Sequence, residues 1–308
     1  VVELNDGSIV HCTQPHKFLT PKGWVEAGSL HDGERVAVPA KLLHEATSSV
    51  TEALAELCAW QLAEGHEACG GKNQVATFTN SDAMVLTRFA ALAKECGVTT
   101  KAPRYEKRHP NVATISTNCL RDTLVRIGFP WGTLSAGRYI PDSIMEAPVE
   151  AQRAFVRALF EAEGSATRTN RVVEISSASE RLVRQLAVML RREGVWLRIS
   201  SKLAKATNSR TPTVRTYWRG IVSGNSLVRF ADKFGFISQR KQALLVEILS
   251  SERNTNVETV PSYTVIAEAR AQGVKLIEIG IRSGGYSKNI GMSKPHARVT
   301  ADRLRGVG

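Results

Sequence analysis

The chain has 308 residues, of which 43% are hydrophobic and 23% charged, a balance typical of a globular protein large enough for two domains. It contains no signal segment and no apolar run near the roughly 20 residues that a membrane-spanning helix needs, so we expect a cytoplasmic protein rather than a membrane protein. The net charge of +12 favours a polyanionic partner, because clustered lysines and arginines release counterions from phosphates, although charge alone does not establish one.

The first part of the chain is predicted to consist of short strands and tight turns. Residues 1–39 carry turn signals at Asn5-Asp6-Gly7, Pro21-Lys22-Gly23 and Asp32-Gly33. A helix is then predicted at 51–63, where leucines and alanines recur at helical spacing and Thr51 is placed to cap it. Because Val1 begins in what resembles the middle of a strand, we expect an internal fragment.

One order of predicted elements occurs twice. After a helix that ends at Gly65, it comprises a strand at 74–79, a helix at 81–96, a basic hairpin-like region at 101–116 and a helix at 119–127. After a helix that ends at Gly164, about 100 residues later, it comprises a strand at 171–175, a helix at 179–192, strands at 196–203 and 214–222, and a helix at 226–234. This unit is too long for a solenoid repeat, and two similar halves on one chain predict a pseudo-two-fold domain.

These patterns give four expected segments. Residues 1–44 form a separate β-rich segment, 45–144 the first half, 145–251 the second half, and 252–308 a polar linker with a small helical and basic segment. The cysteines are odd in number, scattered and without CxxC spacing, which fits a reducing compartment and predicts neither a zinc site nor a disulfide framework. Buried or inert thiols are expected at Cys12, Cys58, Cys69, Cys96 and Cys119.

Both halves end their first helix with the same two residues. Residues 57–65 and 156–164 are apolar helices with a stripe of small residues, and each ends in Glu-Gly, where glycine suits a helix terminus. Small residues let helices pack closely, so packing on a pseudo-two-fold axis would bring Glu64 and Glu163 together. The alternative is that each Glu-Gly only ends a helix at a solvated face, but the occurrence of both at equivalent points favours a paired site.

Paired acids at helix C-termini indicate a metal site. The two carboxylates repel each other and oppose the helix dipole, and divalent cations between them offset this cost. Mg²⁺ takes oxygen ligands and bridges to phosphates, and water bound to a metal is a nucleophile for phosphodiester hydrolysis. The pair therefore predicts a metal-dependent nuclease.

The two helices resemble the paired signature helices of the LAGLIDADG family, with Glu in place of the final Asp in both copies. The resemblance covers residues 45 to 250. It implies an α+β fold of two αββαββα halves, a monomer whose sheets form a saddle over duplex DNA, and a double-strand break at one long asymmetric target site. It also implies that Glu64 and Glu163, together with Gly65 and Gly164, hold Mg²⁺, with Mn²⁺ as a possible substitute.

Two basic residues are further catalytic candidates by the same resemblance. Arg138, in Arg138-Tyr139-Ile140-Pro141, stands where many members of the family carry lysine; arginine stabilises phosphate charge but cannot act as a base. Lys241 resembles another basic position of the family. For Arg138 the alternative is a solvated loop residue. For Lys241 a surface charge is the favoured role.

Alternating basic and polar residues on the predicted strands indicate a DNA-binding surface. Every second side chain of a strand shares a face, so a β-ribbon places polar groups on base edges and basic groups on phosphates. For any single residue a solvated sheet face is the favoured alternative, and the prediction is collective. It comprises Lys72, Asn73, Lys101, Arg104, Lys107, Arg108, Arg168, Asn170, Arg171, Arg198, Lys202, Arg210, Arg215 and Arg219.

The segment before the two halves carries Thr13-Gln14-Pro15-His16, followed by Gly23-Trp24. This resembles the Thr-x-x-His block of intein splicing (Hint) domains. Next to an endonuclease, it implies that His16 polarises the upstream scissile peptide with support from Thr13. The sequence has neither the initial Cys or Ser nor the final His-Asn that splicing needs, so splicing in cis is not expected.

The sequence as a whole predicts an intein-encoded homing endonuclease that makes double-strand breaks in DNA. It would be an intracellular protein, associated with the nucleoid when bound to DNA. Two alternatives stay open, a catalytically decayed DNA-binding remnant and a fragment of a protein-splicing element. A maturase-type RNA-binding role is more distant.

Overall fold

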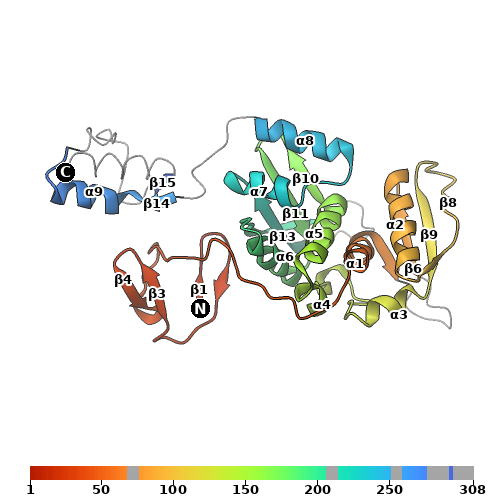
Figure 1. Ribbon diagram of the computed structural model, residues 1–308, viewed down its shortest axis with the longest axis horizontal. Coiled ribbons are helices and arrows are strands. Elements are labelled where there is room, and N and C mark those ends of the chain that lie inside the picture. Colours follow the sequence, from red (N-terminus) through yellow and green to blue (C-terminus); the bar gives the residue numbers. More distant parts are fainter. Residues whose placement is uncertain (68–75, 206–213, 251–258, 276–290, 294–308) are drawn as a thin grey trace.

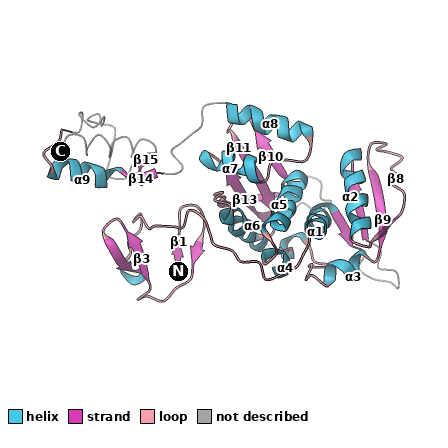
Figure 2. Ribbon diagram, in the orientation of Figure 1, coloured by secondary structure: helices cyan, strands magenta, loops and turns pink. Residues whose placement is uncertain are grey.

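The computed structural model describes residues 1–67, 76–205, 214–250, 259–275 and 291–293. Two halves of mixed helices and strands lie side by side, with smaller units at both ends of the chain (Figure 1). The α+β class is confirmed, since each half packs helices on an antiparallel sheet (Figure 2). None of the described helices combines the length and the apolar character needed to cross a bilayer.

The first half has the order helix, strand, strand, helix, strand, strand, helix, with one additional short strand. Its elements are α1 (Glu52–Glu64), β5 (Gly65–Glu67), β6 (Ala76–Asn80), α2 (Ala83–Glu95), β7 (Thr99–Thr100), β8 (Arg104–Tyr105), β9 (Ala113–Asn118) and α3 (Leu120–Val125). The strands pair in the order β5-β6-β9-β7, and β8 also pairs with β9. The predicted cap of α1 is confirmed, because Thr51 Oγ1 accepts a hydrogen bond from the Leu54 backbone N–H at 3.3 Å.

The second half follows the same order. Its elements are α5 (Val149–Glu163), β10 (Gly164–Thr167), β11 (Val172–Ser177), α6 (Glu180–Arg192), β12 (Arg198–Lys205), β13 (Val214–Val222) and α7 (Asn225–Lys233). The sheet order β10-β11-β13-β12 matches that of the first half strand for strand. Short helices η2 (Ser135–Gly137) and α4 (Asp142–Met145) connect the halves, and α8 (Gln239–Ser250) follows α7.

The shared core runs through the contact between α1 and α5, which pack against each other along their lengths. Ala59 and Ala158 are fully buried, and their small side chains allow the close approach that the sequence predicts. Trp60 and Phe160, also fully buried, anchor the two helices to their own halves. Each such large apolar side chain stabilises the fold by about 1.5–3 kcal/mol.

The N-terminal segment forms two small antiparallel sheets. β1 (Val2–Glu3) pairs with β2 (Ile9–Val10), and β3 (Lys17–Thr20) pairs with β4 (Gly23–Glu26), after which comes the short helix η1 (Ala27–Ser29). The turn between β1 and β2 lies on the second half, where the Ile199 N–H of edge strand β12 donates to the Asp6 carbonyl oxygen at 2.7 Å. The first segment is therefore attached to a specific strand of the second half.

One predicted helix is shorter in the structure, and one helix was not predicted. The helix expected at 119–127 is limited to Leu120–Val125, because Cys119 has a left-handed φ of 63° and Gly128 a φ of 81°. Helix α8 was not predicted as a separate element. At the C-terminal end the structure describes β14 (Thr259–Pro261), α9 (Ser262–Ala271) and β15 (Gly291–Ser293), and most of the expected segment at 252–308 lies outside the described residues.

Candidate active site and DNA-binding face

Helices α1 and α5 each run directly into a strand at Glu-Gly. Gly65 and Gly164 both have extended backbones, with φ values of −76° and −89°, so the left-handed helix ending that favours glycine is not the reason for either. The reason is a close approach. A Cβ at Gly65 would lie 2.3 Å from the Gln61 carbonyl oxygen, and one at Gly164 would lie 2.6 Å from that of Phe160. Glycine thus lets each helix turn into a strand immediately after its acid.

The two acids are close enough for their charges to interact. Burial raises the pKa of Glu64 above its usual range, and the neighbouring Glu163 charge raises it further. Burial also raises the pKa of Glu163, while Arg138 and Lys241 oppose that shift. Glu64 is half-buried, whereas Glu163 keeps an exposed side chain, so we expect solvent to moderate the shift at Glu163. The carboxylates form a pair whose repulsion a cation would relieve.

Arg138 contacts the residues that follow the first acid, and its charge acts on Glu163. Its Nη2 donates to the Gly65 carbonyl oxygen at 3.4 Å and lies 3.6 Å from Oε2 of the buried Glu67. Its own carbonyl oxygen accepts a hydrogen bond from the Ser179 hydroxyl, at the start of α6. Arg138 therefore has its backbone on the second half and its guanidinium on the first, and it is not the solvated loop residue considered as an alternative.

Lys241 lies in the matching place beside the second acid. Its Nζ donates to the Gly164 carbonyl oxygen at 2.8 Å and also bonds to the Glu161 carbonyl oxygen. The side chain is only 13% exposed, so the expected surface charge is wrong; α8 packs on β10 and turns the lysine inward. Burial lowers the pKa of Lys241, and the nearby Glu161 opposes this shift.

Asn80 is a site residue that sequence reasoning missed. Its side-chain amide donates to Glu64 Oε2, and its Oδ1 accepts from the Asp82 backbone N–H at 2.8 Å, which fixes the orientation of the amide. The strand register brings it there, since Gly65 pairs with Phe78, two residues before Asn80. A pairing between strands leaves no local signal in the sequence.

The donor set fits a hard cation. Among the described residues no group of three or more His, Cys, Asp or Glu could hold a metal. The carbonyl oxygens of Gly65 and Gly164, predicted as further ligands, already accept hydrogen bonds from Arg138 and Lys241. What remains at the centre is the two carboxylates of Glu64 and Glu163. These are oxygen ligands of the kind that Mg²⁺ prefers, in a number that leaves coordination positions for water and for substrate phosphates.

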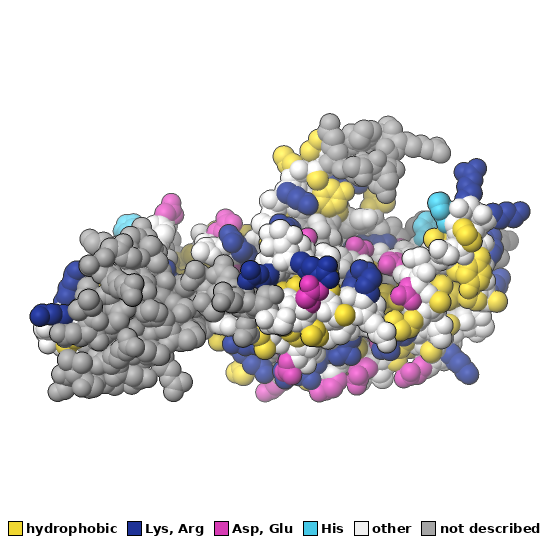
Figure 3. Space-filling model, turned by 90° about the horizontal axis from the view of Figure 1, so that it is seen from above, with side chains coloured by type: hydrophobic (Ala, Val, Ile, Leu, Met, Phe, Trp, Pro, Cys, Tyr) yellow, Lys and Arg dark blue, Asp and Glu magenta, His cyan; other side chains and the backbone are white. Residues whose placement is uncertain are grey.

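The second sheet has a basic face opposite its helices. Lys202 pairs with Tyr217, and Ala204 with Arg215, so these side chains project from the same face as Arg198 and Arg219. Arg219 is already bonded to Glu174 of β11, at 2.9 Å from its Nε, and its charge is partly neutralised within the sheet. Arg198, Lys202 and Arg215 are exposed. Figure 3 shows exposed lysine and arginine side chains at the centre of the molecule and at one end.

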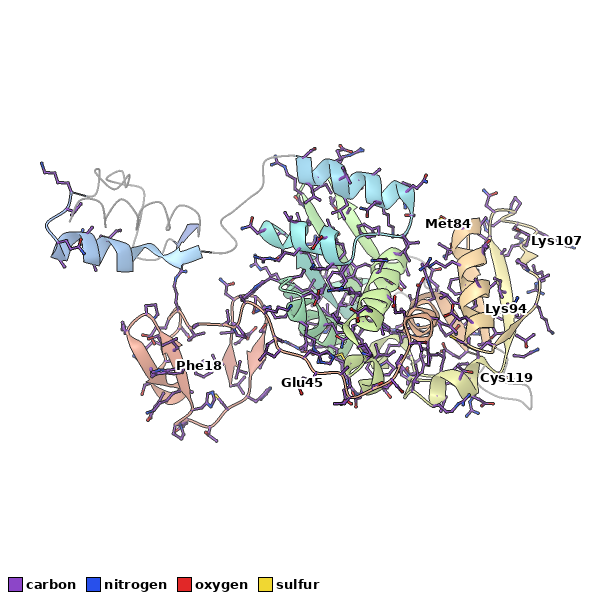
Figure 4. All side chains as sticks on the ribbon, viewed as in Figure 1. Phe18, Glu45, Met84, Lys94, Lys107 and Cys119 are labelled. Carbon is purple, nitrogen blue, oxygen red and sulfur yellow. The ribbon has the colours of Figure 1, made fainter. Side chains whose placement is uncertain are left out.

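The first sheet has a more neutral polar face. Thr77 and Thr79 of β6 pair with Ser116 and Thr114 of β9, and Arg104 of β8 also pairs with Thr114. The opposite face is covered by α2, where Phe78 stacks on Phe89 at 4.1 Å between ring centroids. Lys101, Lys107 and Arg108 are exposed. Lys107 lies beside β8 and β9, at the edge of this half (Figure 4).

The remaining DNA-binding candidates lie in loops or outside the described residues. Asn170 and Arg171 are exposed in the turn between β10 and β11. Arg168 is exposed in the same turn and forms a 2.7 Å ion pair with Glu247 of α8. Lys72, Asn73 and Arg210 lie outside the described residues.

The Thr-x-x-His segment forms one exposed turn. The His16 backbone N–H donates to the Thr13 carbonyl oxygen at 3.2 Å, and both side chains face solvent. The His16 ring meets Phe18 edge-on at 5.2 Å. The two residues are neighbours on the surface of the N-terminal segment and take no part in the paired-acid centre.

Part of the chain matches a known protein family. Residues 150–235, from α5 to the end of α7, match the family described as the LAGLIDADG-like domain. The chain is 29% identical over 240 residues to the replication factor C small subunit of Methanocaldococcus jannaschii, and 26% identical over 310 residues to the replicative DNA helicase DnaB of Rhodothermus marinus. The alignments cover 77% and 93% of this chain but only 12% and 31% of those proteins, so the chain spans less than a third of either relative.

Two solved structures resemble the chain. Mesophilic variants of the homing endonuclease I-DmoI superimpose with a TM-score of 0.45 at 12% identity, covering 64% of this chain and 97% of that one. Full-length WhiA from Thermotoga maritima superimposes with a TM-score of 0.42 at 17% identity, covering 72% of this chain and 67% of that one. Likeness at this level assigns no function.

Proposed function

We propose that this chain is a site-specific endonuclease that makes a double-strand break in DNA by metal-dependent phosphodiester hydrolysis. The observation that carries the proposal is the convergence of Glu64 and Glu163 at the ends of two packed helices, between two sheets with polar or basic faces. We take residues 45–144 and 145–251 as pseudo-symmetric halves, which would act as a monomer on one long asymmetric duplex.

Each residue group has a role in this proposal. Glu64 and Glu163 would hold Mg²⁺ or Mn²⁺, which when bound lowers the pKa of water and stabilises the leaving oxygen. Arg138 and Lys241 place positive charge beside the acids, where scissile phosphates would carry negative charge. The exposed basic residues of β12 and β13 would contact the phosphate backbone.

We further propose that the enzyme belongs to an intein. The two relatives named above are a replication factor subunit and a helicase, and each matches this chain over a minor part of its length. A segment shared by proteins of different function is expected of an inserted element rather than of the host's own activity. The segment 1–44 would be the splicing part, in which His16 polarises a scissile peptide and Thr13 supports it.

A cleavage assay tests the endonuclease. The wild type, Glu64→Gln and Glu163→Gln would be incubated with Mg²⁺ and a library of long duplexes that includes uninterrupted genes for replication proteins. The expected result is a defined double-strand break that both substitutions abolish. A break that persists in both variants would contradict the assignment of the acids.

A DNA-binding remnant without cleavage is the second candidate. Arg138 favours it, since by the resemblance it stands where many members of the family carry lysine, and arginine stays protonated. Tight, salt-sensitive binding without breaks in Mg²⁺ or Mn²⁺, unchanged by Glu64→Gln, would support this candidate over the first.

A further inference from the structure

The Glu64 carboxylate is held in place before any ligand binds. Asn80 lies at the end of β6, and its amide Nδ2 donates to Glu64 Oε2. The amide oxygen of Asn80 accepts a hydrogen bond from the Asp82 backbone N–H at 2.8 Å. The Asp82 carboxylate in turn accepts a hydrogen bond from the Met84 backbone N–H at 2.8 Å, at the start of α2. The carboxylate is therefore fixed through Asn80 to the N-terminus of a helix, and no described residue donates a hydrogen bond to its other oxygen.

Ser177 occupies the equivalent place in the second half. Gly164 pairs with Ile175 as Gly65 pairs with Phe78, and two residues further along each strand stand Ser177 and Asn80. Ser177 Oγ accepts from the Ser179 N–H at 3.1 Å, and Ser179 caps α6, so the turn chemistry matches that of the first half. Serine is shorter than asparagine, and no described residue donates a hydrogen bond to the Glu163 carboxylate.

The charged groups around the two acids also differ between the halves. Glu163 is more exposed than Glu64 and interacts with both Arg138 and Lys241. Glu64 has a fixed neutral donor in Asn80 and interacts with Lys241 alone of the two cations. A carboxylate with a fixed orientation loses less side-chain freedom when it binds a cation than one that must first be ordered.

We propose that Asn80 is a positioning residue that makes the two acids functionally unequal, so that the strand whose cleavage depends on Glu64 is cut first and a nicked duplex is the intermediate. This inference rests on the proposed endonuclease function. It predicts the better-ordered cation site at Glu64 and the weaker one at Glu163.

A reciprocal exchange of the two residues tests the proposal. Asn80→Ser gives the first half the residue of the second, and Ser177→Asn does the reverse. Cleavage of a target duplex labelled on both strands would be followed at single turnover in Mg²⁺. In parallel, Mn²⁺ binding to each variant without DNA would be measured by titration calorimetry, and folding by thermal unfolding.

We expect the wild type to cut one strand at least about fivefold faster than the other and to accumulate nicked duplex. Asn80→Ser should slow the faster strand by about tenfold, leave the other within about twofold, and weaken the tighter Mn²⁺ binding step by a similar factor. Ser177→Asn should speed the slower strand. Equal strand rates in the wild type, or an equal loss on both strands in Asn80→Ser, would overturn the inference.

The metal titration separates this inference from the proposed function. If the wild type cuts neither strand, the endonuclease proposal fails, and the Mn²⁺ affinities still decide the inequality of the acids. A larger loss of affinity in Glu64→Gln than in Glu163→Gln, with Asn80→Ser following Glu64→Gln, would support it. Equal losses in the two glutamine variants would overturn it.

Discussion

The ammonium of Lys241 lies 2.8 Å from the carbonyl oxygen of Gly164, the residue that directly follows Glu163. The same ammonium lies 3.9 Å from Oε1 of Glu161, a buried acid whose other oxygen accepts two backbone N–H groups. Lys241 thus joins α8 to the end of α5 and brings a positive charge to the centre. Its location indicates both a structural and an electrostatic role.

Replacement of Lys241 by methionine should separate these roles. Loss of the charged hydrogen bonds is expected to lower the free energy of unfolding by about 1–3 kcal/mol. Under the proposed function, loss of the positive charge beside the acids is expected to reduce the single-turnover cleavage rate at least about tenfold. Lys241→Arg, which keeps the charge, serves as the control and should retain more activity than the methionine variant. A methionine variant that cuts at the wild-type rate would remove Lys241 from the mechanism.

The raised pKa of Glu64 gives a prediction about pH. A carboxyl group whose pKa is higher in the folded state binds protons more readily there, so the folded protein loses stability as pH rises from the unfolded pKa through the folded one. Glu64→Gln should therefore be more stable than the wild type at pH 7, by about 2 °C in melting temperature, and the difference should shrink towards pH 4.

Magnesium supplies the control for this effect. Millimolar Mg²⁺ should raise the melting temperature of the wild type at pH 7 and leave that of Glu64→Gln nearly unchanged, since a ligand stabilises only the state that binds it. Thermal unfolding between pH 4 and pH 8, with and without Mg²⁺, measures both. A glutamine variant that is less stable than the wild type at every pH would show that the carboxylate is not penalised by burial.

The acids and their helices were predictable from the sequence because helical spacing and the Glu-Gly ending are local features. The role of Lys241 was not, since nothing in residues 239–250 shows that α8 packs on β10 rather than facing solvent. Asn80 was missed for a related reason, because it reaches Glu64 through the pairing of β5 with β6.

The candidate DNA-binding residues show the same limit. Alternation along a strand predicts which side chains share a face, and the shared face of Lys202 and Arg215 follows from the register of β12 and β13. It does not predict what lies on the neighbouring strand. Arg219 pairs with Glu174 across the sheet, an acid that no pattern near residue 219 reveals.

Gly65 should be intolerant of alanine for steric reasons. An added Cβ would lie 2.1 Å from Gln61 Nε2 and 2.3 Å from the Gln61 carbonyl oxygen, so the junction between α1 and β5 would have to shift. We expect Gly65→Ala to lose about 1–3 kcal/mol in urea unfolding and to cleave more slowly, because Glu64 moves with the junction. Gly137→Ala is the control, since its Cβ would meet only Thr133 Cβ at 3.7 Å. Equal stability of the two variants would contradict this explanation.

Binding to DNA should depend on the basic face of β12 and β13. Arg215 is exposed on that face. Arg215→Ala should reduce the steepness of log K for DNA binding against log salt concentration by about 0.9, the value for one phosphate contact. Lys94 is exposed on α2, which covers the opposite face of the first sheet, and Lys94→Ala should leave the slope unchanged (Figure 4). Filter binding over a range of salt concentrations measures both. A larger effect at Lys94 would place the DNA on the helical side.

Asp6 should be needed to keep the N-terminal segment attached to the second half. Its carboxylate lies 3.1 Å from Arg191 Nη2, and both side chains are largely buried, with 14% and 12% exposed. Arg191 also lies over the Trp196 ring at 3.1 Å and donates to the Pro39 carbonyl oxygen at 3.1 Å, so removal of the acid leaves a largely buried guanidinium with fewer partners.

Asp6→Ala is therefore expected to lower the free energy of unfolding by about 1–3 kcal/mol and to speed proteolysis between residues 40 and 50. Lys22→Ala is the matched control, since its ion pair with Glu34 is made by a side chain that is 73% exposed and should contribute little to stability. Proteolysis that is unchanged in Asp6→Ala would show that the backbone bond from Ile199 to Asp6 is sufficient by itself. Under the proposed function, faster proteolysis with unchanged DNA cleavage would show that the two halves act independently of the segment that precedes them.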